Sequence, residues 1–299
     1  MSADKDAPNQ VRLPETANDN GAAANTTTGS PLDLDRPQGG TEAEARAQTE
    51  RLQKLAREAM PERPKKFYTS ATIEPIDASD GASGFAVRLD GRPVKTPARQ
   101  ALVLPTERLA AAVAGEWDAQ VDVIDPQSMP LTRLANTTLD GVAANAERVR
   151  DEVVQYAASD LVCYRADSPS GLVAQQIARW DPILSWASER HGAVFAKADG
   201  IMPVTQSEAA LDAIRTAVAD VPPFPLAGLH VVMTLTGSAL LALALRDGAV
   251  DADGVWGAAH VDEDWQIAQW GEDAEAAARR ATRRREFDAA VFMMVNADG

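Results

Sequence analysis

The sequence predicts an α+β protein in which a small antiparallel sheet with one helix precedes a larger all-α domain. Two observations support this class. Short stretches of alternating apolar and polar residues, separated by turn residues, are confined to residues 67–104, and the later half of the chain has a helical apolar period. We therefore expect a disordered tail at residues 1–65, a small α+β domain at 66–130 and a helical domain at 131–299.

The expected tail differs from the rest of the chain in composition. It is rich in Asn, Asp, Thr, Gly and Ala and poor in large apolar residues, so it cannot bury enough surface to offset the entropy lost on ordering. It has no apolar core of a secretory signal, and its acids are unlike an Arg-rich transit peptide. Residues 41–60 have a weak helical pattern, and Pro61 and Pro64 mark the end of the tail.

The small domain begins with strands. Phe85, Val87 and Leu89 alternate with smaller or polar residues, as expected of a strand with one buried face. Asp90-Gly91 follows and predicts a two-residue hairpin turn, because Gly adopts positive φ without strain. Residues 92–95 would then form the return strand, and residues 101–104 a further short strand.

The first helix is predicted after Thr106. Thr is a good N-cap, and Leu109, Val113 and Trp117 then fall on one helical face at intervals of four. Breaks at Asp125-Pro126 and Met129-Pro130 end this domain.

The boundaries of later helices are predicted from capping residues and prolines. Ser207 predicts one helix start. Asp181-Pro182 predicts another, since Asp suits the N-cap and Pro the first helical position, and that helix should stop at Gly192. The last region, residues 252–295, should hold two helices that meet near Gly271.

One apolar stretch, residues 226–245, has about the length of a membrane-spanning helix. It contains His230, Thr234, Thr236 and Ser238, and no aromatic belt flanks it. This composition favours two buried helices broken near Gly237 over a spanning helix. We therefore expect no stable membrane insertion.

The charge and cysteine content restrict the function. There are 29 Lys and Arg against 44 Asp and Glu, a formal net charge of −15, which argues against nucleic acid and anionic lipid as partners. The one cysteine, Cys163, excludes an internal disulfide or a multi-cysteine zinc site. A reducing compartment is expected.

No motif for catalysis or nucleotide binding is present. The chain has no G-x-G-x-x-G after a strand, no phosphate-binding loop and no G-x-S-x-G turn, so no cofactor is expected. His260 stands beside Asp262, Glu263 and Asp264, which leaves a carboxylate-based, possibly metal-dependent hydrolase as an alternative. An acidic triplet is weak support for a metal site, because such acids usually solvate a helix face.

Aromatic residues beside acids are the most distinctive feature. A Trp body usually packs in a core, but Trp265 and Trp270 are five apart and cannot share one helix face, so at least one should face another helix or a partner. Aromatic anchors rimmed by carboxylates are typical of docking surfaces. The candidate partner-binding residues are Glu116, Trp117, Asp262, Glu263, Trp265, Trp270, Glu272 and Asp273.

Several runs in this order resemble one protein family. They are Leu89 to Pro97 (LDGRPVKTP), Glu116 to Gln120 (EWDAQ), Met129 to Asn136 (MPLTRLAN), Asp160 to Arg165 (DLVCYR), Trp180 to Pro182 (WDP), and Asp262 to Asp273 (DEDWQIAQWGED). The set resembles the assembly chaperone of the F-type ATP synthase, a family of mitochondria and related bacteria that holds free alpha subunits of the catalytic head. The similarity covers residues 66–295.

The resemblance implies a small mixed domain followed by a helical domain, in agreement with the pattern of the residues. It implies an ATP-independent chaperone that binds the unassembled alpha subunit and prevents its aggregation, with acids among Asp262, Glu263 and Glu272 involved. We expect a monomer in the bacterial cytoplasm, or in the mitochondrial matrix if the source is eukaryotic. A structural subunit bound permanently to a complex is a further alternative.

Overall fold

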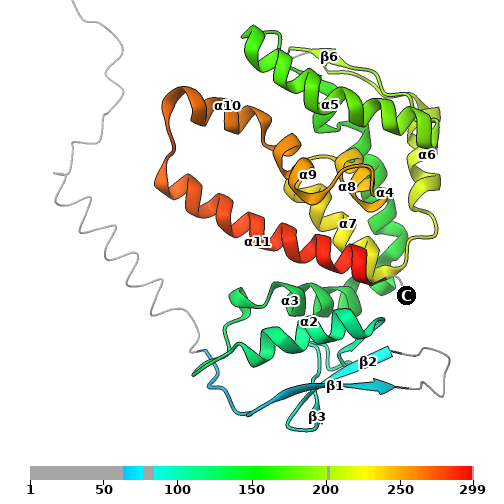
Figure 1. Ribbon diagram of the computed structural model, residues 1–299. Helices are drawn as coiled ribbons and strands as arrows, with labels where there is room; N and C mark the ends of the chain where they lie inside the picture. The colour runs from blue at the N-terminus through cyan, green and yellow to red at the C-terminus, as the bar shows by residue number, and fades with distance from the viewer. Residues whose placement is uncertain (1–62, 77–83, 201–202, 298–299) are drawn as a thin grey trace, which may run out of the picture. The chain divides into compact units, whose positions relative to one another are not determined.

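The computed structural model describes residues 63–76, 84–200 and 203–297 (Figure 1). Almost all of the predicted disordered tail, including its weak helical pattern, lies outside the described residues. Residues 63–65, the last three of the predicted tail, are described. The backbone N–H of Ile124 donates to the Pro64 carbonyl at 2.8 Å, and Arg63 forms an ion pair with Asp125 at 2.7 Å. Arg63 and Pro64 thus pair with a segment some 60 positions later, and the extent of the tail stays a prediction.

The sheet is antiparallel and centred on β2 (Gly84–Leu89), which pairs with β1 (Ala71–Ile76), β3 (Arg92–Pro93) and β4 (Val103–Leu104). The predicted hairpin is present, with Asp90 at φ 47° and Gly91 at φ 76°, which matches the twist of the flanking strands. The α+β class predicted from the sequence is confirmed.

Helix α2 (Glu107–Asp118) packs against the sheet through the predicted apolar face (Figure 1). Leu109 and Val113 are fully buried, and each contributes about 2 kcal/mol of burial energy. The Thr106 hydroxyl accepts from the Leu109 backbone N–H at 3.3 Å, so the predicted N-cap is confirmed.

Most of the remaining described residues are helical. Short helical turns connect the longer helices: η1 (Pro126–Ser128), the π-helical turn η2 (Thr138–Val142), η3 (Ala143–Asn145) and η4 (Leu161–Cys163). A two-stranded parallel pair, β5 (Tyr164–Arg165) and β6 (Ala198–Asp199), flanks them. The long helices are α3 (Pro130–Thr137), α4 (Ala146–Ala158), α5 (Ser170–His191), α6 (Glu208–Val218), α7 (Pro223–Thr236), α8 (Ala239–Arg246), α9 (Ala252–Ala259), α10 (Val261–Trp270) and α11 (Ala274–Asn296).

The apolar stretch of residues 226–245 forms α7 and α8, as predicted. Gly237 breaks it at φ 72°, and Ser238 caps α8 by accepting from the Leu241 N–H at 2.9 Å. Helix α8 is almost entirely buried in the helical core, and more than half of the residues of α7 are buried. Among the described residues, no helix is long and apolar enough to cross a membrane.

The predicted helix start at Asp181-Pro182 is wrong. Helix α5 begins eleven residues earlier, at Ser170, and Pro182 lies inside it. Trp180 is buried there and its indole N–H donates to the Ala258 carbonyl at 2.7 Å, while Asp181 forms an ion pair with Arg165 at 2.9 Å. These tertiary contacts stabilise a helix through a proline, which local preference alone disfavours. The predicted stop at Gly192 is confirmed, with φ 70°.

The last region contains three helices where we expected two. Helices α10 and α11 meet at Gly271 as predicted, but His260 separates a further helix, α9. The cap at Ser207 is confirmed by its bond from the Ala210 N–H at 3.2 Å.

Two hydrophobic clusters hold the described part together. The smaller cluster includes the sheet, α2 and α3, and also Ala227 of α7 and Met293 of α11. The larger one lies among α4 to α11. Leu134 and Val142 border both clusters, so α3 and the turn after it join the two parts. The division into domains at residue 130 stays a prediction.

Candidate functional site

The end of the α10–α11 pair forms a cleft of about 300 Å³. Four of the predicted site residues line it, namely Glu263, Trp270, Glu272 and Asp273. Arg280 of α11 closes the opposite wall. Arg280 was not predicted as a site residue, although it lies in the arginine-rich run of residues 279–285.

Trp270 is the one aromatic residue among those that line this cleft, and 79% of its surface is accessible. It ends α10, and Gly271 turns the chain with φ 87° and ψ 170°, a conformation that only glycine adopts easily. Glu272 follows, exposed, and has no hydrogen bond or ion pair to any described residue. An exposed indole thus lies beside an unpaired carboxylate.

Asp273, the next residue, is the N-cap of α11. Its carboxylate accepts from the Ala276 backbone N–H at 2.8 Å and caps α11. An acid is favourable there because it satisfies a free N–H and interacts with the helix dipole.

The three acids at the start of α10 point to different partners. Asp262 accepts from the Gln176 side-chain amide at 2.7 Å, and Asp264 forms an ion pair with Arg280 at 2.5 Å. Glu263 lies 3.9 Å from the His260 ring. Within the described part of the chain, no three His, Cys, Asp or Glu side chains gather as metal ligands would.

His260 is buried and tied to its own helix. Its Nδ1 lies 2.8 Å from the Trp256 carbonyl, and its ring packs on the Trp256 ring with centroids 4.1 Å apart. Burial is the main cause that lowers the His260 pKa, so the ring is neutral near pH 7. Within the described residues, Asp262, Glu263 and His260 therefore do not form the ligand set that the metal-dependent version of the hydrolase alternative would require.

Trp265 faces the interior, in contrast to Trp270. It is half-buried, and its ring lies so close to Gly171 of α5 that a methyl group on Gly171 would clash with it. The two tryptophans of α10 thus point to different faces, as their spacing predicts.

The structure does not bring Glu116 and Trp117 to this cleft. Trp117 packs against the smaller hydrophobic cluster, and Glu116 precedes it in α2. The Glu116 carboxylate accepts three hydrogen bonds from the start of α3: from the Leu131 N–H at 2.8 Å, and from the Thr132 N–H and hydroxyl at 2.7 Å each. Burial raises the Glu116 pKa even though these bonds oppose the shift. Trp117 packs edge-on against Tyr68 with centroids 5.8 Å apart. Both residues therefore join structural elements.

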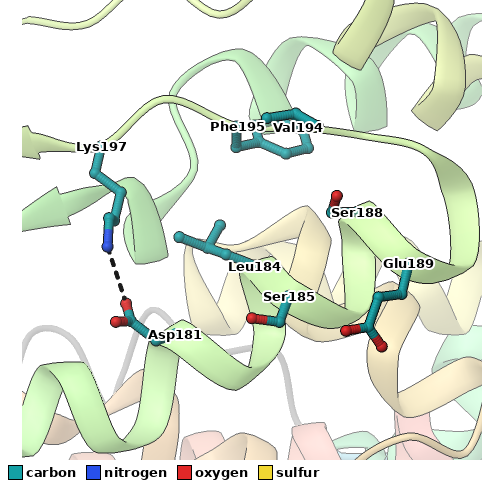
Figure 2. Close-up of a pocket in the computed structure, with 8 residues that line it drawn as sticks. All are labelled: Asp181, Leu184, Ser185, Ser188, Glu189, Val194, Phe195 and Lys197. Carbon is teal, nitrogen blue, oxygen red and sulfur yellow. Dashed lines mark hydrogen bonds and ion pairs between the residues drawn. The ribbon is translucent and has the colours of Figure 1, made fainter.

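A second hollow, of about 360 Å³, lies between α5 and the segment that returns from it. Asp181 lies at its edge and forms ion pairs with Lys197 at 3.5 Å and with the buried Arg165 at 2.9 Å. Figure 2 shows the residues that line the hollow, none of which was predicted as a site residue: Asp181, Leu184, Ser185, Ser188, Glu189, Val194, Phe195 and Lys197.

Comparison with known proteins identifies the family. The family model of the ATP12 chaperone protein matches residues 65–188. The crystal structure of Atp12 from Paracoccus denitrificans is 39% identical, covers 77% of this chain and 97% of its own, and superposes with a TM-score of 0.71. The chain belongs to the ATP12 chaperone family. The family resemblance drawn from the sequence is thereby confirmed.

Two further solved structures agree. The Atu1473 protein of Agrobacterium tumefaciens, a candidate chaperone, is 39% identical over 88% of this chain and 92% of its own, with a TM-score of 0.75. A P. denitrificans Atp12p mutant with an aspartate changed to lysine is 38% identical over 77% of this chain and 97% of its own, with a TM-score of 0.71. This ATP12 chain therefore has the fold of bacterial relatives over nearly their whole length.

Proposed function

We propose that this ATP12 family chaperone binds the unassembled alpha subunit of the F-type ATP synthase catalytic head and prevents its aggregation without using ATP. One observation carries the proposal. The exposed Trp270 and the unpaired Glu272 lie together at the rim of the α10–α11 cleft. An aromatic anchor with a polar rim is the usual composition of an interface centre.

The acidic rim suits reversible capture. An alpha subunit without its neighbours exposes surfaces that they would otherwise cover, and such apolar patches drive aggregation. A chaperone must cover these surfaces quickly and later yield to the true partner. Carboxylates at a rim raise the association rate and contribute less to residence time than a buried apolar interface does.

The charges of the cleft fit basic groups on the client. Asp264 is already paired with Arg280, whereas Glu272 has no partner among the described residues. The net charge of −15 adds a general attraction for a basic surface. The proposal places the protein in the bacterial cytoplasm as a monomer and includes no catalytic step and no cofactor.

The direct test is an aggregation assay on purified alpha subunit from the same organism. Diluted from denaturant without nucleotide, alpha should remain soluble in the presence of the full chain and scatter light in its absence. Equal scattering with and without the chain would overturn the proposal. A requirement for ATP would overturn its ATP-independent part.

The site is tested by reversing one charge. Glu272→Lys should weaken binding of alpha by about tenfold or more, since a favourable pair becomes a repulsive one. Glu208→Lys is the matched control, because Glu208 is an exposed acid at the start of α6. If both variants bind alpha as tightly as the wild type in a titration, Glu272 does not belong to the site.

A further inference from the structure

The α10–α11 cleft contains an indole and a carboxylate that the described part of the chain leaves unused. Trp270 and Glu272 line the cleft from either side of Gly271, and no described residue pairs with the Glu272 carboxylate. No described cation lies over the Trp270 ring, although such contacts occur at other rings. Two other places in the same chain show which chemical group suits an indole and a carboxylate together.

The first place is the adjacent pair Trp180 and Asp181 in α5. The guanidinium carbon of Arg165 lies 5.2 Å from the centroid of the Trp180 ring, and its Nη2 atom forms an ion pair with Asp181 at 2.9 Å. The Arg165 side chain is only 6% exposed. One guanidinium group therefore contacts an indole and a carboxylate at the same time.

The second place is Trp256 in α9. The guanidinium carbon of Arg284 lies 5.5 Å from the Trp256 ring centroid, and the group forms ion pairs with Asp253 at 2.6 Å and with Asp288 at 2.7 Å. Asp253 is three positions before Trp256 and lies beside it on the same helix. A tryptophan with an acid close in sequence thus receives an arginine at two separate places in this fold.

The chemistry of arginine explains why it suits such places. The guanidinium group is flat, so its face can lie on a ring while the N–H groups at its edge donate to a carboxylate. It is also weakly hydrated for a cation, which lowers the cost of removing it from water. The ammonium group of lysine is a compact, strongly hydrated point charge, and it fits the two contacts less well.

The charges that line the cleft favour a cation from outside. Three acids line the cleft against one base, Arg280. Arg280 is held by Asp264 at 2.5 Å and does not lie over the Trp270 ring. The arginine of the cleft itself therefore leaves Trp270 and Glu272 free for a cation of a partner.

We infer that the cleft binds an arginine side chain of the client, with the guanidinium group on the Trp270 ring and paired with Glu272. The apolar stem of this side chain lies on Ile267 and Ala277, which line the cleft and are partly buried. Gly271, at φ 87° and ψ 170°, sets the directions of the indole and the carboxylate. The inference rests on the proposed function for the identity of the client, and it names the residue type that the site selects.

The residue type is tested without the client. N-acetyl-arginine methylamide is titrated into the full chain isotope-labelled at the tryptophan nitrogens, and the indole N–H signal of Trp270 is the one lost in Trp270→Phe. The arginine compound should shift this signal, and the matching lysine compound should bind more weakly by about threefold or more. Glu272→Gln should weaken binding of the arginine compound. Glu208→Gln, which changes an exposed acid at the start of α6, should not.

The client is tested by changing its arginines. Each surface arginine of the alpha subunit is replaced by lysine, which keeps the charge, and each variant is titrated against the wild-type chaperone. At least one replacement should weaken binding by about tenfold. The same replacement should change binding to Trp270→Leu by less than about twofold, because that variant has already lost the ring on which the guanidinium group lies. Against Glu208→Gln it should again cost about tenfold.

Thermal unfolding of each chaperone variant confirms that the fold is retained, as expected for exposed side chains. The inference is overturned if the arginine and lysine compounds shift the Trp270 signal equally or if neither shifts it. It is also overturned if alpha binds and no replacement of an arginine weakens it. Failure of alpha to bind at all would count against the proposed function alone, because the arginine compound is titrated without alpha.

Discussion

Two segments of this chain have the same three residue types and opposite surroundings. Gly115, Glu116 and Trp117 end α2, and Trp270, Gly271 and Glu272 join α10 to α11. In the first segment the carboxylate caps α3 and the indole packs on Tyr68. In the second the indole is 79% exposed and the carboxylate is unpaired within the described residues.

This difference shows that an aromatic residue beside an acid indicates a candidate docking site but does not indicate whether its groups are free to bind a partner. The pattern identified both segments as candidate docking sites. In the first, the Glu116 carboxylate is used by α3 and the Trp117 ring packs on Tyr68, although the indole N–H has no hydrogen-bond partner among the described residues. In the second, the same groups remain available to a partner. The four predictions below test that contrast, from the largest expected effect to the smallest.

Replacing each tryptophan by arginine should give the largest difference in the free energy of unfolding. Trp117→Arg should lower the free energy of unfolding by about 3 kcal/mol or more, because it places a charge where the ring packs between α2 and Tyr68. Trp270→Arg should change it by no more than about 0.5 kcal/mol, since that ring is exposed. Urea unfolding of both variants measures this, and equal losses would remove the contrast.

Replacing each glutamate by glutamine should give a smaller difference in the free energy of unfolding. Glu116→Gln keeps the shape of the side chain but offers one oxygen where the start of α3 needs two, so it should cost about 2 kcal/mol. Glu272→Gln should cost less than about 0.5 kcal/mol and weaken binding of alpha instead. A stable Glu116→Gln variant with impaired binding would reverse the assignment of the two residues.

A second buried acid predicts a pH effect. Asp160 is fully buried and accepts from the Leu240 N–H at 2.9 Å, and burial raises its pKa from 3.8 to about 6. The folded state therefore holds this proton at a higher pH than the unfolded state does. Its contribution to stability falls as pH rises between about 4 and 6 and is constant above that window.

Comparison with Asp160→Asn isolates this contribution. The stability of the wild type relative to the variant should increase by on the order of 2 kcal/mol when the pH is lowered from about 7 to about 4. Chemical unfolding at a series of pH values measures it. Asp273→Asn is the control for changing an acid at an exposed helix start. A difference that does not vary with pH would show that Asp160 is ionised throughout.

The smallest effects, of opposite sign, should come from the two glycines. Gly115 is exposed and helical with free space around it, so Gly115→Ala should stabilise the fold by about 0.5–1 kcal/mol. Gly271 has φ 87°, so Gly271→Ala should destabilise by about 1 kcal/mol and shift Trp270. Thermal unfolding compares the two variants. A change in melting temperature of the same sign in both would contradict the different backbone conformations of the two glycines.

Local patterns in the sequence predicted much of the fold. The Asp90-Gly91 hairpin, the caps at Thr106 and Ser207 and the break at Gly237 depend on residues a few positions apart, and the structure confirms each of them. The start of α5 was predicted wrongly because the Trp180 bond to Ala258 joins residues 78 positions apart. Local preference cannot register such a contact.

By itself, the sequence determined the α+β class, most helix boundaries and the family, because these depend on periodicity, capping chemistry and the order of short motifs. It also predicted a site among the acids and tryptophans near residues 262–273, which stays a prediction. Only the tertiary structure decided that Trp270 is exposed while Trp117 is packed, and that Asp140 accepts a hydrogen bond from Thr96, 44 positions earlier. The physical reason is that a helical period shows which residues share a face, whereas the element that covers the face comes from a distant part of the chain.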